Sequence, residues 1–78
     1  MRSYGNSGNS GVRAYEAGPD WIRVQFNSGA VYTYTINSAG SYNIAQMQRL
    51  ARAGSGLNTF INQNCRYRYE GADESIFL

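Results

Sequence analysis

Arginine and tyrosine are the residues of this chain best suited to bind a ligand. All seven cationic side chains are arginine, and the 78 residues include seven tyrosines and one tryptophan. A guanidinium group offers a planar fork of donors that fits a phosphate and stacks on aromatic rings. The combination is typical of surfaces that contact nucleotides, although genomic base composition alone also produces a preference for arginine over lysine.

The residues that most catalytic sites use are scarce. The chain has no histidine, the commonest general acid and base at neutral pH. Its five carboxylates (Glu16, Asp20, Glu70, Asp73 and Glu74) show no catalytic spacing, and no glycine-rich loop precedes a Lys-Ser or Lys-Thr pair. Cys65 would need a base or a cation beside it to act as a nucleophile, and we interpret it as a buried structural thiol. We therefore expect a protein that is not an enzyme.

Composition also limits what can stabilise so short a chain. One cysteine cannot form an intrachain disulfide, and without histidine it cannot assemble a zinc site, so we expect no metal and no cofactor. No apolar run approaches the ~18 residues of a membrane span, and no signal pattern is present. We expect a cytoplasmic protein without membrane contact that gains stability by forming a homo-oligomer.

The length predicts a single domain with two extensions. Residues 1–11 contain almost no apolar side chains and predict a flexible arm. The folded domain is expected over residues 12–69, and residues 70–78 form a C-terminal tail. We interpret its last residues, 76–78, as either disordered or, preferably, in contact with another subunit.

Alternation of apolar and polar residues predicts a three-stranded sheet. Residues 12–16 predict a first strand, and residues 21–26 and 30–36 predict a hairpin. The turn Asn27-Ser28-Gly29 joins the hairpin strands, with Gly29 in the left-handed position of a bulge. In the first strand, Arg13 and Tyr15 could each point to either side.

The turn fixes which side chains share a face of the hairpin. It opposes Val24 to Tyr32 and Ile22 to Tyr34, and a slip of one residue would mix the two sets. The predicted core face consists of Ile22, Val24, Phe26, Tyr32, Tyr34 and Ile36. The opposite face consists of Trp21, Arg23, Gln25, Val31, Thr33 and Thr35. Tyr32 and Tyr34 could instead form a stacking platform for bases, but their shared face favours the core.

Beyond residue 36 the apolar spacing becomes helical. Ser41 is the expected N-cap of a first helix that ends at Gly54. A second short helix should follow, and residues 65–69 alternate again, which predicts a short extra strand or an extended cover. The two helices add Met47, Leu50, Phe60 and Ile61 to the predicted core. The fold class is α+β, a three-stranded antiparallel meander with two short helices packed on one face.

Besides Tyr32 and Tyr34, two groups of residues are candidates for ligand contact. Trp21 and Arg23 on the uncovered sheet face suit a planar or phosphorylated ligand, or equally a second subunit. Asn58, Asn62 and Asn64 near two arginines either grip phosphates or tie the helix to neighbouring loops. The full predicted ligand-binding set is Trp21, Arg23, Arg49, Arg52, Asn62, Arg66 and Arg68.

The order of these features resembles the KTSC domain, a small module found at the C-terminus of some lysyl-tRNA synthetases and alone in bacterial and phage proteins. The matching residues are Tyr15, Phe26, Gly29, Tyr32-Thr33-Tyr34, Ser55-Gly56, Phe60-Ile61-Asn62 and Tyr67 or Tyr69. The family tends to carry Val-Pro where this chain has Asn37-Ser38. The resemblance implies a suspected RNA-binding role, inferred from the synthetase fusion.

These observations predict a binding module for RNA or a nucleotide-like ligand. The alternative is a phage-type interaction protein that binds a host protein or sequesters a small signalling nucleotide. The net charge of only +2 counts against strong nonspecific binding of nucleic acid.

Overall fold

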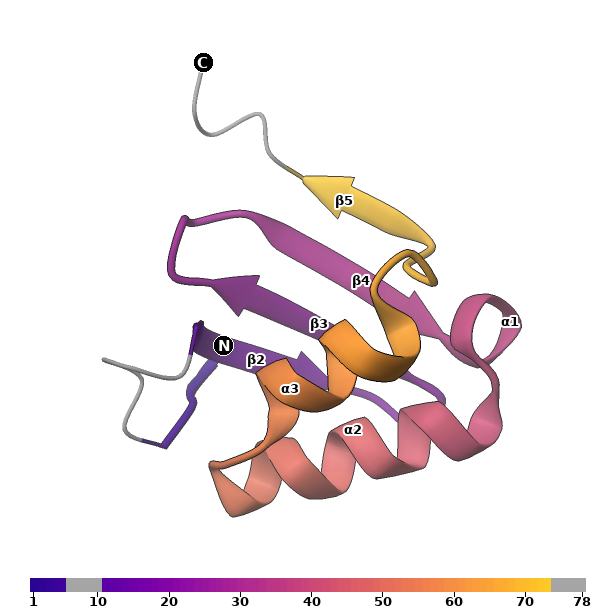
Figure 1. Ribbon diagram of the computed structural model, residues 1–78, viewed down its shortest axis with the longest axis horizontal. Coiled ribbons are helices and arrows are strands. Elements are labelled where there is room, and N and C mark those ends of the chain that lie inside the picture. Colours follow the sequence, from indigo (N-terminus) through magenta and orange to yellow (C-terminus); the bar gives the residue numbers. More distant parts are fainter. Residues whose placement is uncertain (6–10, 74–78) are drawn as a thin grey trace.

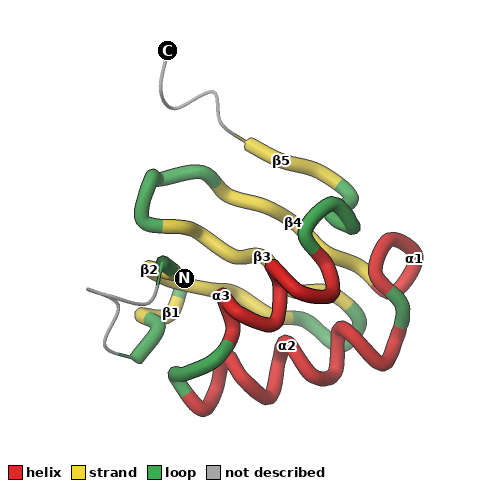
Figure 2. The backbone as a smooth tube through the Cα atoms, viewed as in Figure 1, coloured by secondary structure: helices red, strands yellow, loops and turns green. Residues whose placement is uncertain are grey.

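In the computed structural model, which describes residues 1–5 and 11–73, one antiparallel sheet carries a layer of helices on one face (Figures 1 and 2). The predicted α+β class is confirmed, but the sheet has five strands, in the order β1-β2-β3-β4-β5, instead of three. The strands are β1 (Arg2–Ser3), β2 (Val12–Ala17), β3 (Trp21–Phe26), β4 (Val31–Thr35) and β5 (Gly71–Asp73). The helices are α1 (Ile36–Ala39), α2 (Ser41–Ala53), α3 (Leu57–Phe60) and the π-helix η1 (Ile61–Cys65).

The β3–β4 hairpin has the predicted register. Val24 lies opposite Tyr32, and Ile22 lies opposite Tyr34. The Phe26 amide donates to the Ala30 carbonyl at 2.9 Å, and Gly29 takes a positive φ of 98° in the turn. Because the register is as predicted, the side chains of the two strands are sorted between the faces as expected.

The core lies between the helices and one face of the sheet. As predicted, Ile22, Val24, Tyr34, Met47 and Ile61 are buried. Four other predicted core residues are only partly buried against this cluster: Phe26, Tyr32, Leu50 and Phe60. The sequence left open which way Arg13 and Tyr15 point. In β2, which has a bulge between Val12 and Ala14, the Tyr15 side chain is buried and the Arg13 side chain is exposed.

The prediction that Ile36 belongs to the core is wrong. Its side chain is 40% exposed because β4 ends at Thr35, and Ile36 begins the single turn α1. Thr35 and Ser38 form a capping box in which each side-chain oxygen accepts the other residue's backbone N–H, at 3.2 and 3.0 Å. This reciprocal cap favours a helical turn where the sequence pattern suggested a continuing strand.

The helical layer differs in detail from the prediction. Ser41 is the first residue of α2 and Gly40 occupies the cap position, while Gly54 ends the helix in a left-handed conformation, as expected. The predicted second helix continues through η1 as far as Cys65, so residues 65–69 do not form the extra strand. That strand is β5, which pairs with β4 within the segment predicted to be a tail. Residues 76–78 lie outside the described residues.

Residues 1–5 of the predicted flexible arm are held against the domain, while residues 6–10 of that arm lie outside the described residues. Arg2 and Ser3 pair with Tyr15 and Ala14 as strand β1. Tyr4 is fully buried, and its hydroxyl accepts the backbone N–H of Leu57 at 3.0 Å. One buried aromatic ring and this long-range hydrogen bond offset the ordering entropy of an otherwise polar segment.

Candidate functional site

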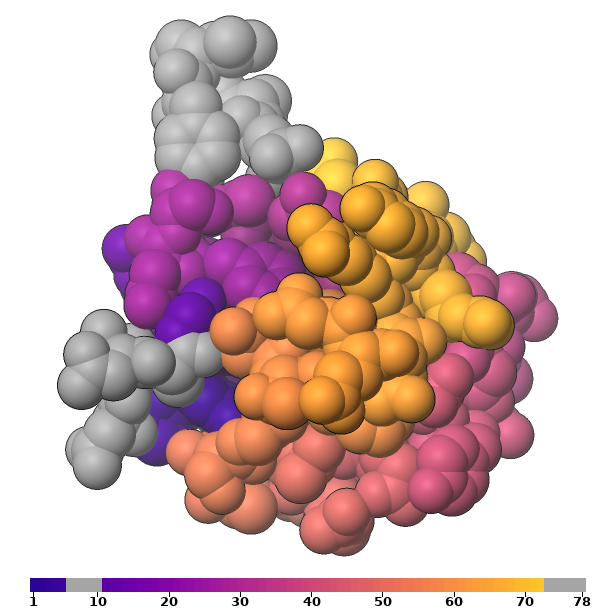
Figure 3. Space-filling view, in the orientation of Figure 1, coloured from indigo at the N-terminus to yellow at the C-terminus, as the bar shows by residue number. Residues whose placement is uncertain are grey.

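An open cleft of about 370 Å³ lies between the β3–β4 hairpin and the segment that runs from α3 to the residues before β5. Figure 3 shows these two parts meeting on one face of the molecule, the hairpin in purple and magenta and the helical segment in orange. Aromatic rings and a few polar side chains line the cleft: Phe26, Tyr32, Tyr34, Tyr67, Tyr69, Asn58, Asn62 and Arg66. The sheet contributes the first three rings, and the helical segment supplies the polar groups.

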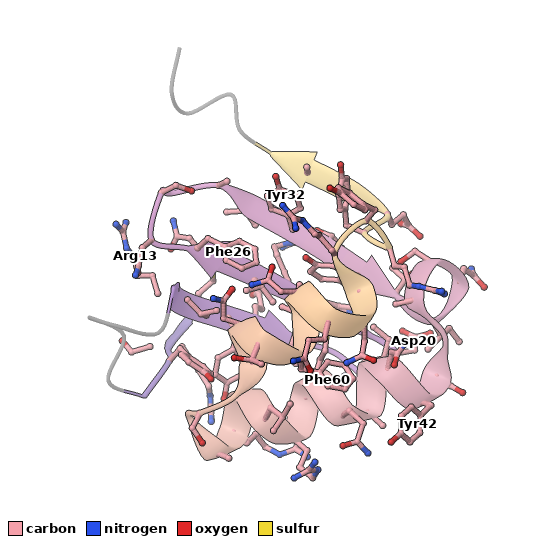
Figure 4. All side chains as sticks on the ribbon, viewed as in Figure 1. Arg13, Asp20, Phe26, Tyr32, Tyr42 and Phe60 are labelled. Atoms are coloured by element: carbon pink, nitrogen blue, oxygen red, sulfur yellow. The ribbon has the colours of Figure 1, made fainter. Side chains whose placement is uncertain are left out.

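The rings behind the cleft form a connected edge-to-face cluster. The centroids of Phe26 and Tyr32, labelled in Figure 4, lie 5.5 Å apart at an interplanar angle of 88°. Tyr69 makes the same kind of contact with Tyr32 at 4.8 Å and with Tyr34 at 6.5 Å. Such contacts stabilise the packing beyond the area they bury, so this wall is held in place before any ligand arrives.

Two tyrosines of the cleft have opposite roles. Tyr34 is 1% exposed, and burial raises the pKa of its hydroxyl well above the ordinary value, so it stays neutral and structural. Tyr67 is 78% exposed, and the guanidinium of Arg66 lies 5.5 Å from its ring centroid. Tyr67 is therefore an exposed aromatic residue lining the cleft, with a cation over its ring.

The π-helix orients the polar side chains of the cleft. Ile61 and Cys65, at the two ends of η1, are buried, while the residues between them are exposed. Asn58, Asn62 and Arg66 follow at intervals of four and line the cleft. Single π-turns of this kind occur frequently at functional sites.

The two asparagines of the cleft differ from other asparagines on the helices. Asn43 and Asn64 donate their amides to the carbonyls of Ala39 and Phe60, at 2.8 and 3.2 Å. Within residues 1–5 and 11–73, no side-chain hydrogen bond is made by Asn58 or Asn62. Their donors and acceptors are therefore available to a ligand.

Arg66 sets the charge of the cleft. It is the only charged side chain among the described residues that line it. A guanidinium at the rim of an aromatic cleft can bind an anionic group on a ligand whose planar part lies inside.

The uncovered sheet face holds Trp21 and Arg23, as the register predicted, but both are half-buried. The guanidinium of Arg23 lies 5.4 Å from the Trp21 ring centroid and contacts the Glu16 carboxylate at 3.0 Å. It also donates to Thr33 Oγ1 at 3.3 Å. Its charge is thus balanced within the chain. The adjacent hollow contains two further carboxylates, Asp20 and Glu70, which disfavour an anionic ligand there.

The predicted ligand-binding residues do not form one site. Asn62 and Arg66 line the cleft, while Arg49 lies on the exposed side of α2 and donates to Gln46 Oε1 at 2.6 Å. Arg52 faces a different groove, and Arg68 lines neither. The predicted ligand-binding set did not include Tyr67, which also lines the cleft; its signals in the sequence were the adjacent Arg66 and its place in the resemblance to the KTSC domain.

The remaining candidates for chemistry are the cysteine and groups that could bind a metal. Cys65 is buried, and burial raises the pKa of its thiol, an effect that nearby Arg68 partly opposes. The predicted burial of Cys65 is therefore confirmed. Among residues 1–5 and 11–73, no group of histidine, cysteine or carboxylate side chains could hold a metal ion.

Comparisons of the chain with models of known protein families, with curated proteins and with solved structures found no match. Among the helices that the structure describes, none has the length and apolar character needed to cross a membrane.

Proposed function

We propose that this chain is a non-enzymatic binding module whose cleft takes one nucleotide, either free or as a unit of single-stranded RNA. The observation that carries this proposal is the composition of the cleft. A rigid aromatic wall faces two asparagine amides without partners in the described chain and a single guanidinium. Each part corresponds to one part of a nucleotide.

The aromatic rings suit the base. Bases stack on aromatic side chains, and each such contact contributes roughly 1–3 kcal/mol to binding. Tyr67, the most exposed aromatic residue that lines the cleft, is the residue best placed for this contact. The cleft volume of about 370 Å³ lies near the lower end of the range for ligand sites and therefore suits one nucleotide better than a larger ligand.

The polar groups suit the remainder of the ligand. An asparagine amide offers a donor and an acceptor side by side, the combination that hydrogen-bonds to base edges. Arg66 can bind the phosphate through its fork of N–H donors. The proposal agrees with the RNA-binding role that the resemblance to the KTSC domain implies.

The test compares two exposed tyrosines. Tyr42, labelled in Figure 4, is 71% exposed on α2 and does not line the cleft, so Tyr42→Ala is a matched control for Tyr67→Ala. We expect Tyr67→Ala to weaken nucleotide binding about 5- to 150-fold, the equivalent of one lost stacking contact, and Tyr42→Ala to leave it unchanged. Calorimetric titration with the four ribonucleoside monophosphates and with short single-stranded RNA measures both.

The same titrations distinguish a free nucleotide from single-stranded RNA as the ligand. Binding of mononucleotides alone would favour sequestration of a small signalling nucleotide, while binding of RNA alone would favour an RNA-binding module. Failure of every nucleotide and RNA to bind, or equal effects of the two substitutions, would overturn the proposal. Native mass spectrometry of freshly purified protein would show a retained nucleotide and the oligomer number together.

A further inference from the structure

The seven arginines divide into those held by neighbours and those that are not. Three donate hydrogen bonds within the described chain: Arg13 to the Asn27 carbonyl, Arg23 to Glu16 and Thr33, and Arg49 to Gln46. Over residues 1–5 and 11–73, the side chains of Arg2, Arg52, Arg66 and Arg68 make no hydrogen bond or ion pair. Arg66 lines the cleft described above. Arg2 and Arg52 line a different groove.

Arg2 and Arg52 line one groove, which has a volume of about 560 Å³ and lies between the N-terminal strand and the last turn of α2. Arg2 is brought there by the pairing of β1 with β2, and Arg52 by the C-terminal end of the helix. The groove shares no lining residue with the aromatic cleft. It is therefore a separate surface, assembled only because residues 1–5 join the sheet.

These two guanidinium groups are the cationic side chains of the groove. The one carboxylate among its described lining residues is Glu16, which is already paired with Arg23 at 3.0 Å. Gln48 also lines the groove, but its amide nitrogen donates to the carbonyls of Gly18 and Trp21 at 2.7 and 3.0 Å. Two cationic side chains without partners in the described chain therefore share a groove whose one described acidic side chain is already paired.

The lining excludes a stacked base. Tyr15 is the one aromatic residue among the described lining residues, and it is 6% exposed, so its ring face is not available. Two guanidinium groups together favour a doubly charged tetrahedral anion, to which each can donate more than one N–H. We propose that this groove binds a phosphate group, either free phosphate or a phosphate of an RNA backbone.

The test uses two arginines of the same helix. Arg52→Gln removes a cation from the groove, whereas Arg49→Gln removes one that Gln46 already holds outside it. Titration of the full chain with inorganic phosphate, followed by the backbone and arginine side-chain NMR signals, reports the site directly. We expect saturable shifts at residues 2 and 52, and affinity about 10- to 150-fold lower in Arg52→Gln but unchanged in Arg49→Gln, since a hydrogen bond to a charged group contributes ~1.5–3 kcal/mol.

Further variants and probes distinguish free phosphate from RNA phosphate, and the groove from the aromatic cleft. Arg2→Gln should have the same effect as Arg52→Gln, and Tyr67→Ala should have none, which makes this result independent of the nucleotide proposal. If Arg52→Gln weakens binding of a short oligoribonucleotide that lacks bases, the ligand is a backbone phosphate. If Arg52→Gln weakens binding of inorganic phosphate only, the ligand is free phosphate. Absence of shifts at residues 2 and 52 with both probes, or equal effects of the Arg49 and Arg52 substitutions, would overturn the inference.

Discussion

At the scale of single residues, burial keeps two ionisable groups of the core in their neutral form. The thiol of Cys65 and the hydroxyl of Tyr34 both lie in the core, and burial raises both pKa values. In the unfolded chain the thiol ionises near its ordinary pKa of 9.0, while in the folded chain it stays neutral to higher pH. Above pH 9.0 the unfolded state therefore binds fewer protons than the folded state, and the protein loses stability.

We predict that the free energy of unfolding is flat near neutral pH and falls as the pH rises above 9.0. Each group can contribute a slope of up to about 1.4 kcal/mol per pH unit. Urea denaturation across this range measures the slope. Cys65→Ala is the control, because it removes the thiol and should delay the fall until Tyr34 contributes. An identical slope in both proteins would mean that the thiol is not protected.

Sequence reasoning succeeded for residues whose neighbours alternate and failed for isolated ones. Side chains alternate between the two faces of the hairpin, and only one register keeps the apolar and polar sets apart. That register correctly predicts Tyr34 on the core face and Trp21 on the opposite face. Tyr4 has no such pattern, since its partner Leu57 lies 53 residues along the chain. A contact of that kind is determined by tertiary packing and leaves no local signal.

At the scale of elements, the same division appears. The hairpin and α2 were predictable because glycine turns and helical spacing are encoded locally. The strands at the two edges, β1 and β5, have two and three residues and form because β2 and β4 present unpaired backbone groups to them. The π-helix η1 that orients the cleft likewise has no periodic signature in the sequence.

The attachment of β1 depends on a close approach between two glycines. Gly5 has a φ of +39°, and an added Cβ would meet the backbone of Gly54, the residue that ends α2. We predict that Gly5→Ala destabilises the protein by at least about 1 kcal/mol, because it adds both a clash and backbone strain. Gly71→Ala is the control, since nothing lies within 4 Å of the position that a Cβ would take there. Denaturant unfolding measures both; equal stability of the two variants would contradict a close contact between Gly5 and Gly54.

At the scale of the whole molecule, the surfaces differ in how their charges are used. The uncovered sheet face balances Arg23 with Glu16, whereas the cleft and the groove hold guanidinium groups without acidic partners in the described chain. This difference supports the two proposals above, that the cleft and the groove each contact a phosphate. The sheet face stays available for the self-association that the sequence predicts. The net charge of +2 thus understates the charge open to ligands.

This distribution predicts a limited salt dependence of RNA binding. If a single strand engages the three arginines of the cleft and the groove (Arg66, Arg2 and Arg52), the slope of log K against log salt is about −2.1. Arg66→Gln and Arg52→Gln should each reduce the magnitude of the slope by about 0.7, because each removes one phosphate contact. Arg49→Gln, whose guanidinium is held by Gln46, should leave it unchanged. Equal slopes in all variants would show that binding does not depend on these arginines, since the slope counts the phosphates they neutralise.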